Sequence, residues 1–191
     1  MKKWKLAISI LIGIILIFFI SGYKFTSLSA AKANAFLPKD AEMIEEYNTG
    51  SSVVFLFKSD GEKLYQTVLS EKFGVLFQRS LSTSIPYSSD ELQTVGGISF
   101  TTEKDAATIL SVVSNDEKVA YIEAGVEPNI ERKDIHKGER ISFLFPFSEQ
   151  IDFLNPTAFD KAGKALYYYG PPKNVNHVNI PEDIKWHKII D

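Results

Sequence analysis

The absence of cysteine excludes several classes of functional site. There is none among the 191 residues, so the chain has no thiolate nucleophile, no cysteine-ligated zinc and no iron–sulfur cluster. It also has no Gly-x-Ser-x-Gly, Walker A or dinucleotide-binding motif. We therefore expect no metal and no cofactor, and no motif identifies a catalytic residue.

The sequence also lacks any block of five like charges, and its charges are unevenly placed. The first 24 residues hold four lysines and no acidic residue, whereas the rest of the chain holds 17 basic and 24 acidic residues, a net charge of −7. Nucleic acids and anionic surfaces are bound chiefly through Lys and Arg. The acidic body thus argues against nucleic acid, or an anionic lipid surface, as the main partner.

One long apolar run stands at the amino-terminal end. Leu6 to Tyr23 gives 18 residues without a charge, which as a helix would rise about 27 Å against a hydrocarbon core of about 30 Å. Lys2, Lys3 and Lys5 precede the run, and this bias favours a cytoplasmic amino terminus. Residues 1–24 are therefore predicted to be a cytoplasmic tip and a single membrane anchor, with the body outside the cell.

An alternative is a secreted protein, cleaved near Ala33 or Ala35. Small residues recur there in the spacing that signal peptidases use, in the stretch AAKANA. Ala33, however, lies ten residues beyond Tyr23, and a signal-peptide core usually has only about 7–15 apolar residues. Length and spacing favour the uncleaved anchor, with a spacer at 25–35 and one domain at 36–191.

A short helix is predicted where this domain begins. Leu37, Ala41, Ile44 and Tyr47 recur at helical spacing, with acidic residues on the opposite face. Asn48-Thr49-Gly50 would end the helix.

The remaining chain is predicted to be mainly β. Alternating Val, Ile, Phe, Tyr and Thr between turn residues is typical of antiparallel strands. The expected elements are a hairpin at 51–70 around Asp60-Gly61, a strand at 74–81, a loop at 84–91, a strand at 96–102, a second hairpin at 103–124 turning at 114–117, a charged loop at 131–139, a strand at 140–147 with Pro146 at a sheet edge or strand end, and a hairpin at 158–170. A helix ending near Val113 is the alternative for the first half of 103–124. The fold class is an antiparallel β-sandwich or partly open barrel.

The last 80 residues or so carry a resemblance. The stretch VVSNDEKVAYIEAG is followed by a hairpin with Ala158, Asp160, Gly163, Leu166 and Tyr167. This pattern resembles uncharacterised membrane-anchored extracytoplasmic proteins of Bacillus-type bacteria. The resemblance implies an extracytoplasmic location and a β fold, and it carries no catalytic residue.

Aromatic side chains provide the candidate binding residues. Aromatics make up 13% of the chain, and Tyr167-Tyr168-Tyr169 lie in one predicted strand. Because strand side chains alternate, Tyr167 and Tyr169 share one face, and that face is either part of the core or a surface that binds peptide or glycan. Trp186, in the apolar tail, is expected to be buried, after one helical turn at Pro181-Glu182-Asp183.

Polar candidates for chemistry are weak. Asp134, His136 and Glu139 lie close together, but on a mixed-charge segment where convergence on a metal or substrate is not expected. Asp60-Gly61 and Asp160-x-x-Gly163 have too few carboxylates for calcium and are interpreted as turns.

These observations favour a binding module over an enzyme. The predicted function is a membrane-tethered interaction domain that contacts an envelope protein or a cell-wall component. The alternatives are an extracytoplasmic hydrolase using carboxylates such as Asp134 and Glu139, and a carrier or sensor with an apolar pocket between sheets.

Overall fold

A computed structural model describes residues 2–20, 22–173 and 183–190. Within the amino-terminal helix, side chains are described for residues 4–13. Across this described part of the chain, no helix combines the length and apolar character needed to cross a membrane. The predicted helical turn at Pro181 falls largely outside these residues.

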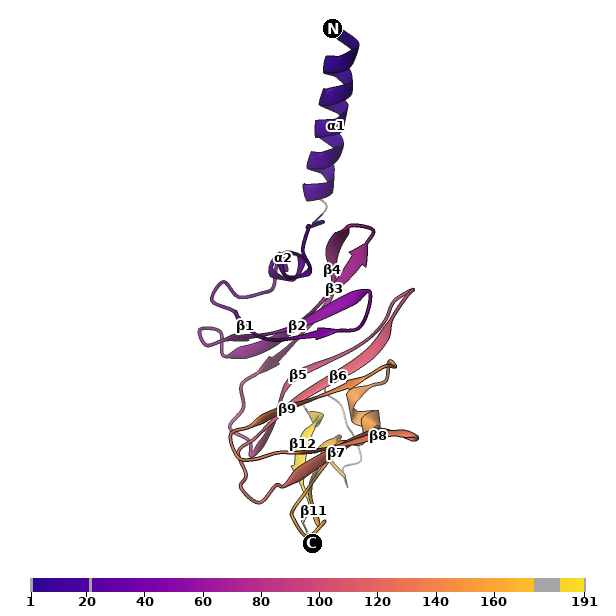
Figure 1. The fold of residues 1–191 in the computed structure, drawn as a ribbon. Coiled ribbons are helices and arrows are strands. Elements are labelled where there is room, and N and C mark those ends of the chain that lie inside the picture. The colour runs from indigo at the N-terminus through magenta and orange to yellow at the C-terminus, as the bar shows by residue number, and fades with distance from the viewer. Residues whose placement is uncertain (1, 21, 174–182, 191) are drawn as a thin grey trace.

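The described residues form two α-helices, twelve strands and one 3-10 turn (Figure 1). The helices are α1 (Lys2–Ile20) and α2 (Ser27–Lys32). The strands are β1 (Glu42–Asn48), β2 (Ser52–Ser59), β3 (Leu64–Phe73), β4 (Leu76–Pro86), β5 (Leu92–Thr101), β6 (Ala106–Ser114), β7 (Tyr121–Val126), β8 (Asn129–Asp134), β9 (Arg140–Phe145), β10 (Thr157–Phe159), β11 (Ala165–Gly170) and β12 (Lys185–Lys188), with the turn η1 (Ile151–Leu154) between β9 and β10.

The strands pair into three antiparallel sheets, none of which closes on itself within the described residues. The first sheet has the order β1-β2-β3-β4, the central sheet β5-β6-β9, and the third sheet β12-β11-β10-β7-β8. Figure 1 shows them as successive layers, with α1 projecting beyond the first sheet and β11 at the opposite end. The prediction of a mainly β, antiparallel fold is confirmed.

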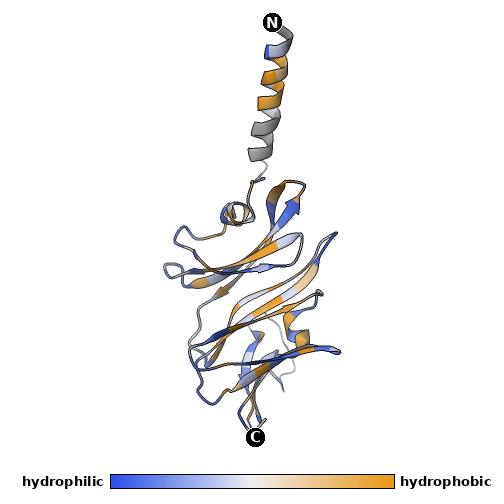
Figure 2. Cartoon of the chain, in the orientation of Figure 1, coloured by the Kyte–Doolittle hydropathy of each residue, from blue (hydrophilic) through white to orange (hydrophobic). Residues whose placement is uncertain are grey.

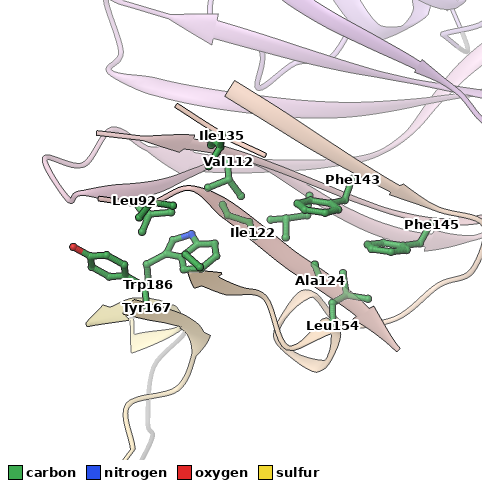
Figure 3. Close-up of a cluster of buried hydrophobic side chains, with 13 residues drawn as sticks. Leu92, Val112, Ile122, Ala124, Ile135, Phe143, Phe145, Leu154, Tyr167 and Trp186 are labelled. Carbon is green, nitrogen blue, oxygen red and sulfur yellow. The ribbon is translucent and has the colours of Figure 1, made fainter. Parts of the chain in front are cut away.

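Two apolar cores hold the layers together. Side chains of the first and central sheets form one core, which includes Leu56 and Ile109. Those of the central and third sheets form the other, which includes Phe143 and Trp186 (Figure 3). Strand β6 contributes to both, because alternate residues point to opposite faces. The central sheet is therefore covered on both sides.

The outer face of the first sheet is covered by α2. Ala31 of this helix is fully buried against Phe55, Phe57 and Val68. Thr26 caps the helix, its hydroxyl accepting a hydrogen bond of 3.1 Å from the Ser29 amide. Residues 25–35, expected to be a spacer, thus contain a helix docked on the sheet, whereas α1 projects away as a stalk whose described middle part is hydrophobic (Figure 2).

The helix predicted at residues 37–47 is wrong, because β1 occupies 42–48 and pairs with β2. The register shifts between Met43 and Glu45, and such a bulge re-phases the alternation of side chains. Ile44 and Tyr47 therefore both reach the core between the first two sheets. The bulge places Ile44 and Tyr47, which are three positions apart, on the same side of the strand, and this spacing is typical of a helix.

The second predicted hairpin is correct in its strands and wrong in its pairing. Strands β6 and β7 both form, but β6 pairs with β5 and β9, and β7 pairs with β8 and β10. The predicted turn at 114–117 is instead the passage from the central to the third sheet. Since β6 is apolar on both faces, it needs a neighbouring strand on each edge and a layer on each face.

Two predicted loops are shorter than expected. Strand β4 continues to Pro86, and β8 occupies residues 129–134 of the segment expected to be a charged loop. The hairpins β2–β3 and β10–β11 and the end of β9 just before Pro146 are confirmed, as is the position of β9 at an edge of its sheet.

Candidate binding groove

A groove of about 450 Å³ lies where the central and third sheets meet the end of β4. Its described lining comes from β4, the following loop, β5, β11 and β12: Ser84, Ile85, Pro86, Ser88, Asp90, Leu92, Gln93, Thr94, Tyr169, Ile184, Lys185 and Trp186. Strands β11 and β12 belong to the layer farthest from α1 (Figure 1). The groove therefore lies away from the stalk.

Two aromatic side chains form one wall of the groove. Tyr169 and Trp186 are directly paired across β11 and β12, and their rings meet edge to face with centroids 5.6 Å apart. The Trp186 indole nitrogen donates a hydrogen bond of 3.1 Å to the Thr94 hydroxyl, and the side chain is 7% exposed. The predicted burial of Trp186 is confirmed, and its polar atom is satisfied.

The predicted binding residues Tyr167 and Tyr169 lie in different environments. Tyr169 is half-buried and borders the groove. Burial, followed by the nearby Asp152 carboxylate, raises the pKa of its phenol, which keeps the ring neutral. Tyr167 is 3% exposed and belongs to the core between the central and third sheets (Figure 3).

The hydroxyl of Tyr167 makes a specific internal contact. It donates a hydrogen bond of 2.8 Å to Asp116. Burial alone would raise the pKa of the Asp116 carboxyl, but hydrogen bonds from the Lys118 amide and from Tyr167 lower it overall. Burial and this carboxylate also raise the pKa of Tyr167. Tyr167 therefore supports the core behind the groove, and Tyr169 alone of the pair reaches it.

The lining of the groove also includes polar groups. The Ser88 hydroxyl donates a hydrogen bond of 2.8 Å to the Asp90 carboxylate, and the Gln93 side-chain amide reaches the Pro86 carbonyl at 3.5 Å. Ser88 and Asp90 are exposed. A groove lined by aromatic and apolar side chains together with hydroxyl, amide and carboxylate groups can hold a ligand that has both apolar and hydrogen-bonding parts.

Asp134, His136 and Glu139 do not converge on a site. The His136 ring nitrogen Nδ1 lies 2.9 Å from the Glu139 carboxylate, which also accepts the His136 amide hydrogen. These bonds lower the pKa of Glu139. Asp134 lies instead beside Arg132, 3.9 Å away. All three side chains are largely exposed in and after β8.

The two Asp–Gly segments form turns, as predicted. Asp60 lies in the β2–β3 turn, where its carboxylate accepts hydrogen bonds from Lys58 and Tyr87 that lower its pKa. Asp160 accepts the amide hydrogens of Ala162 and Lys164 in the β10–β11 turn. No group of three or more potential metal-ligating residues was found in the described part of the chain.

No protein family, no curated protein and no solved structure matches this chain. The groove geometry is thus the main guide to function. Sequence reasoning identified Tyr169 but missed the residues opposite it, because the segment 84–91 was expected to be a loop unrelated to the carboxyl-terminal strands. Its Pro86 and serine cluster gave no indication that β12 would lie alongside.

Proposed function

We propose that this protein is a membrane-tethered, extracytoplasmic binding module whose ligand, an envelope component, occupies the groove beside Tyr169. The observation that carries the proposal is the composition of that groove. Aromatic side chains together with several hydrogen-bonding side chains are a composition suited to recognising a chain-like ligand such as a peptide or glycan segment.

The same composition favours binding over hydrolysis. The described lining contains one carboxylate, Asp90, and no histidine. Hydrolysis by carboxylates uses two of them placed on either side of the scissile bond. Asp134 and Glu139, the pair considered from the sequence, are held by Arg132 and His136 and are not part of the groove lining.

The carrier or sensor alternative draws some support from Leu92, Ile85 and Ile184, which are apolar parts of the lining. The polar side chains of the lining distinguish the two ideas. A wholly apolar ligand would remove water from Ser88, Asp90 and Gln93 and offer them no hydrogen bonds beyond those they make within the protein, which is unfavourable. A ligand with hydrogen-bonding groups along one side fits better.

The tether rests on the apolar run at residues 6–23 and on the way α2 is docked. Cleavage near Ala33 or Ala35 would remove α2 and uncover Phe55 and Phe57, which are fully buried beneath it. Exposing two such rings costs about 1.5–3 kcal/mol each. A secreted form starting after Ala33 would thus lose part of its own core, which favours the uncleaved anchor.

The layered sheets suit this role. The three stacked sheets form a sandwich-like body, and α1 leaves from the first of them (Figure 1). With the apolar run in the membrane and its lysines inside, the groove would face the envelope. The acidic body agrees with a partner other than nucleic acid.

Site-specific photo-crosslinking in intact cells tests this proposal. A photoreactive residue replaces Ser88 at the groove and, as the matched control, Lys161 in the exposed β10–β11 turn. We expect a discrete crosslinked product from position 88 alone, lost when Tyr169 is changed to Ala. Loss of the product after treatment with a wall-degrading muramidase would identify a glycan, and peptides from a second protein in the isolated product would identify an envelope protein. Equal labelling from both positions would refute the groove as the binding site.

A further inference from the structure

We propose that the body does not hang freely from its anchor but rests on the bilayer through a defined surface that contacts anionic lipid headgroups. This surface, called here the proximal surface, consists of Phe36, Phe73 and Val75 with Lys32, Lys72 and Arg79. The inference rests on the proposed membrane tether and extends it, because a tether alone requires no contact between the body and the lipid.

The first argument is the short distance along the chain between α1 and the first sheet. Lys24 forms an isolated bridge with Phe77 of β4, in which each amide donates to the other's carbonyl, at 2.8 and 2.7 Å. Lys24 follows Ile20, the end of α1, by four positions, and four extended residue steps span at most about 14 Å. If the apolar run ends at the membrane surface, Phe77 is fixed close to the headgroups.

The second argument is the hairpin tip that lies two residues from this bridge. Strands β3 and β4 extend together toward the base of α1 (Figure 1), and the Tyr23 ring contacts the Phe73 ring with centroids 5.9 Å apart. At the tip Phe73 is 49% exposed and Val75 is 83% exposed. Large apolar side chains beside an apolar anchor are typical of residues that enter the headgroup region.

Further exposed aromatic residues come from the segment around α2. Phe36, which follows α2 by four residues, is 84% exposed, and Phe25, which precedes it, is 68% exposed. The Arg79 guanidinium of β4 donates a hydrogen bond of 2.6 Å to the Ala33 carbonyl. This bond joins the end of α2 to the same strand that carries the hairpin tip.

The third argument is charge. The stretch around α2 (residues 22–33) and the β3–β4 hairpin (residues 64–86) contain four basic residues, Lys24, Lys32, Lys72 and Arg79, and one acidic residue, Glu71. This local excess contrasts with the net −7 of the chain beyond residue 24. Each Lys or Arg near an anionic surface strengthens contact about fivefold, and the effect fades within a Debye length. The acidic remainder is therefore repelled from the bilayer while this end is attracted.

Contact at the proximal surface would orient the whole molecule. The anchor supplies one attachment and the hairpin tip a second, and the bridge at Phe77 prevents the two from moving independently. The stacked sheets would then stand away from the bilayer, with the third sheet outermost.

Depth-dependent quenching in vesicles tests the proposal with the full chain. Because the protein has no cysteine, one fluorescent label can be placed by Val75→Cys at the tip or, as the matched control, by Phe153→Cys, a 55% exposed position in η1. Each labelled protein is reconstituted into phosphatidylcholine vesicles with and without phosphatidylglycerol. A nitroxide on the lipid headgroup serves as the quencher.

We expect several-fold stronger quenching at position 75 than at position 153, and a further increase when phosphatidylglycerol is present. Lys32→Gln with Lys72→Gln should abolish that increase, whereas Lys161→Gln should leave it unchanged. Equal, weak quenching at both positions in protein that floats with the vesicles would overturn the proximal surface while leaving the tether intact. Failure of the protein to float with the vesicles would instead overturn the tether itself.

Discussion

The two cores on either side of the central sheet are built differently. The core toward the third sheet is the larger and contains four buried aromatic side chains, Phe143, Phe145, Tyr167 and Trp186; it is called here the aromatic core. The core toward the first sheet is smaller, has Tyr47 and Phe100 as its buried aromatic side chains, and carries a polar network around Tyr47 at its border. One sheet thus meets a larger apolar core on one face and a smaller, partly polar contact on the other.

The polar network connects β1 to β9 between the first two layers. The Tyr47 hydroxyl lies 2.8 Å from both the Glu45 carboxylate and the Ser142 hydroxyl, and Arg140 forms a salt bridge with Glu45. Burial, followed by these contacts with Glu45, raises the pKa of Tyr47 to about 12. Directional bonds of this kind set the position of one layer on another, whereas the aromatic core stabilises the fold by apolar burial.

Glycine explains why the two layers approach closely on the network side. A Cβ added at Gly96 of β5 would lie 2.9 Å from a methyl carbon of Leu56 in the first sheet. At Gly97 the added atom would meet Ile151, which packs with the opposite core, at 2.5 Å. Because Gly96 and Gly97 carry no side chains, Leu56 can approach the central sheet from one face and Ile151 from the other.

The largest expected effect concerns the aromatic core. Trp186→Ala removes a side chain that is 7% exposed and should lower the free energy of unfolding by about 3–5 kcal/mol, out of a typical total of about 5–15 kcal/mol. Urea denaturation measures the change, with Phe153→Ala at an exposed site as control. An unchanged midpoint for Trp186→Ala would mean that β12 contributes nothing to this core.

A smaller effect is expected where the layers approach most closely. Gly96→Ala should destabilise the protein by about 1–3 kcal/mol through overpacking against Leu56. Leu56→Ala alone should destabilise the protein by creating a cavity. In the double variant the methyl group added at position 96 should fill part of that cavity, so the combined loss of stability should be smaller than the sum of the two single losses. A double-mutant cycle in urea measures this coupling. Strict additivity would contradict the close contact between the two layers.

Disrupting the polar network should lower the free energy of unfolding by less than either of the preceding changes. Arg140→Ala leaves Glu45 without its salt bridge, and since these side chains are 27% and 35% exposed, solvent screening limits the loss to about 1–2 kcal/mol. Lys58→Ala, which removes an exposed pair with Asp60, is the control and should change stability by less than about 1 kcal/mol. Equal effects of the two substitutions would show that the network is no more than a surface pair.

The smallest predicted effect is a change in how the free energy of unfolding depends on pH. The pKa of Asp116 is lower in the folded protein than in the unfolded chain, so its contribution is present above the unfolded value of about 3.9 and is lost as pH falls through the folded value. Asp116→Asn should make the unfolding free energy less steep in pH below about 4 than in the parent protein. Parallel pH profiles for the two proteins would contradict this assignment.

How far the sequence predicts the fold depends on whether the information is local. The β2–β3 hairpin was predictable because Asp60-Gly61 specifies a tight turn between two apolar strands. The pairing of β6 was not, since its two-sided apolar pattern indicates burial without saying which strands will cover it. The helix expected at 37–47 failed because a bulge between Met43 and Glu45 imitates helical spacing.

The groove illustrates the same limit. Tyr169 could be selected from the Tyr167–Tyr169 triplet, but alternation alone could not decide which tyrosine face is buried. Both Tyr167 and Tyr169 lie on the core side of β11, and only the position of Tyr169 beside Thr94 and Trp186 brings it to the groove. That position depends on contacts between residues far apart in the chain.

The two-sided burial of the central sheet has a consequence for how the protein assembles. Strands β5 and β6 are made before β9, and β7 and β8, which belong to a different sheet, are made in between. Until β9 is made, the newly made β5–β6 hairpin exposes an unpaired edge and apolar faces, the features that let two nascent chains aggregate. The interval between the synthesis of β6 and the arrival of β9 is therefore the stage at which a chaperone would protect this chain most.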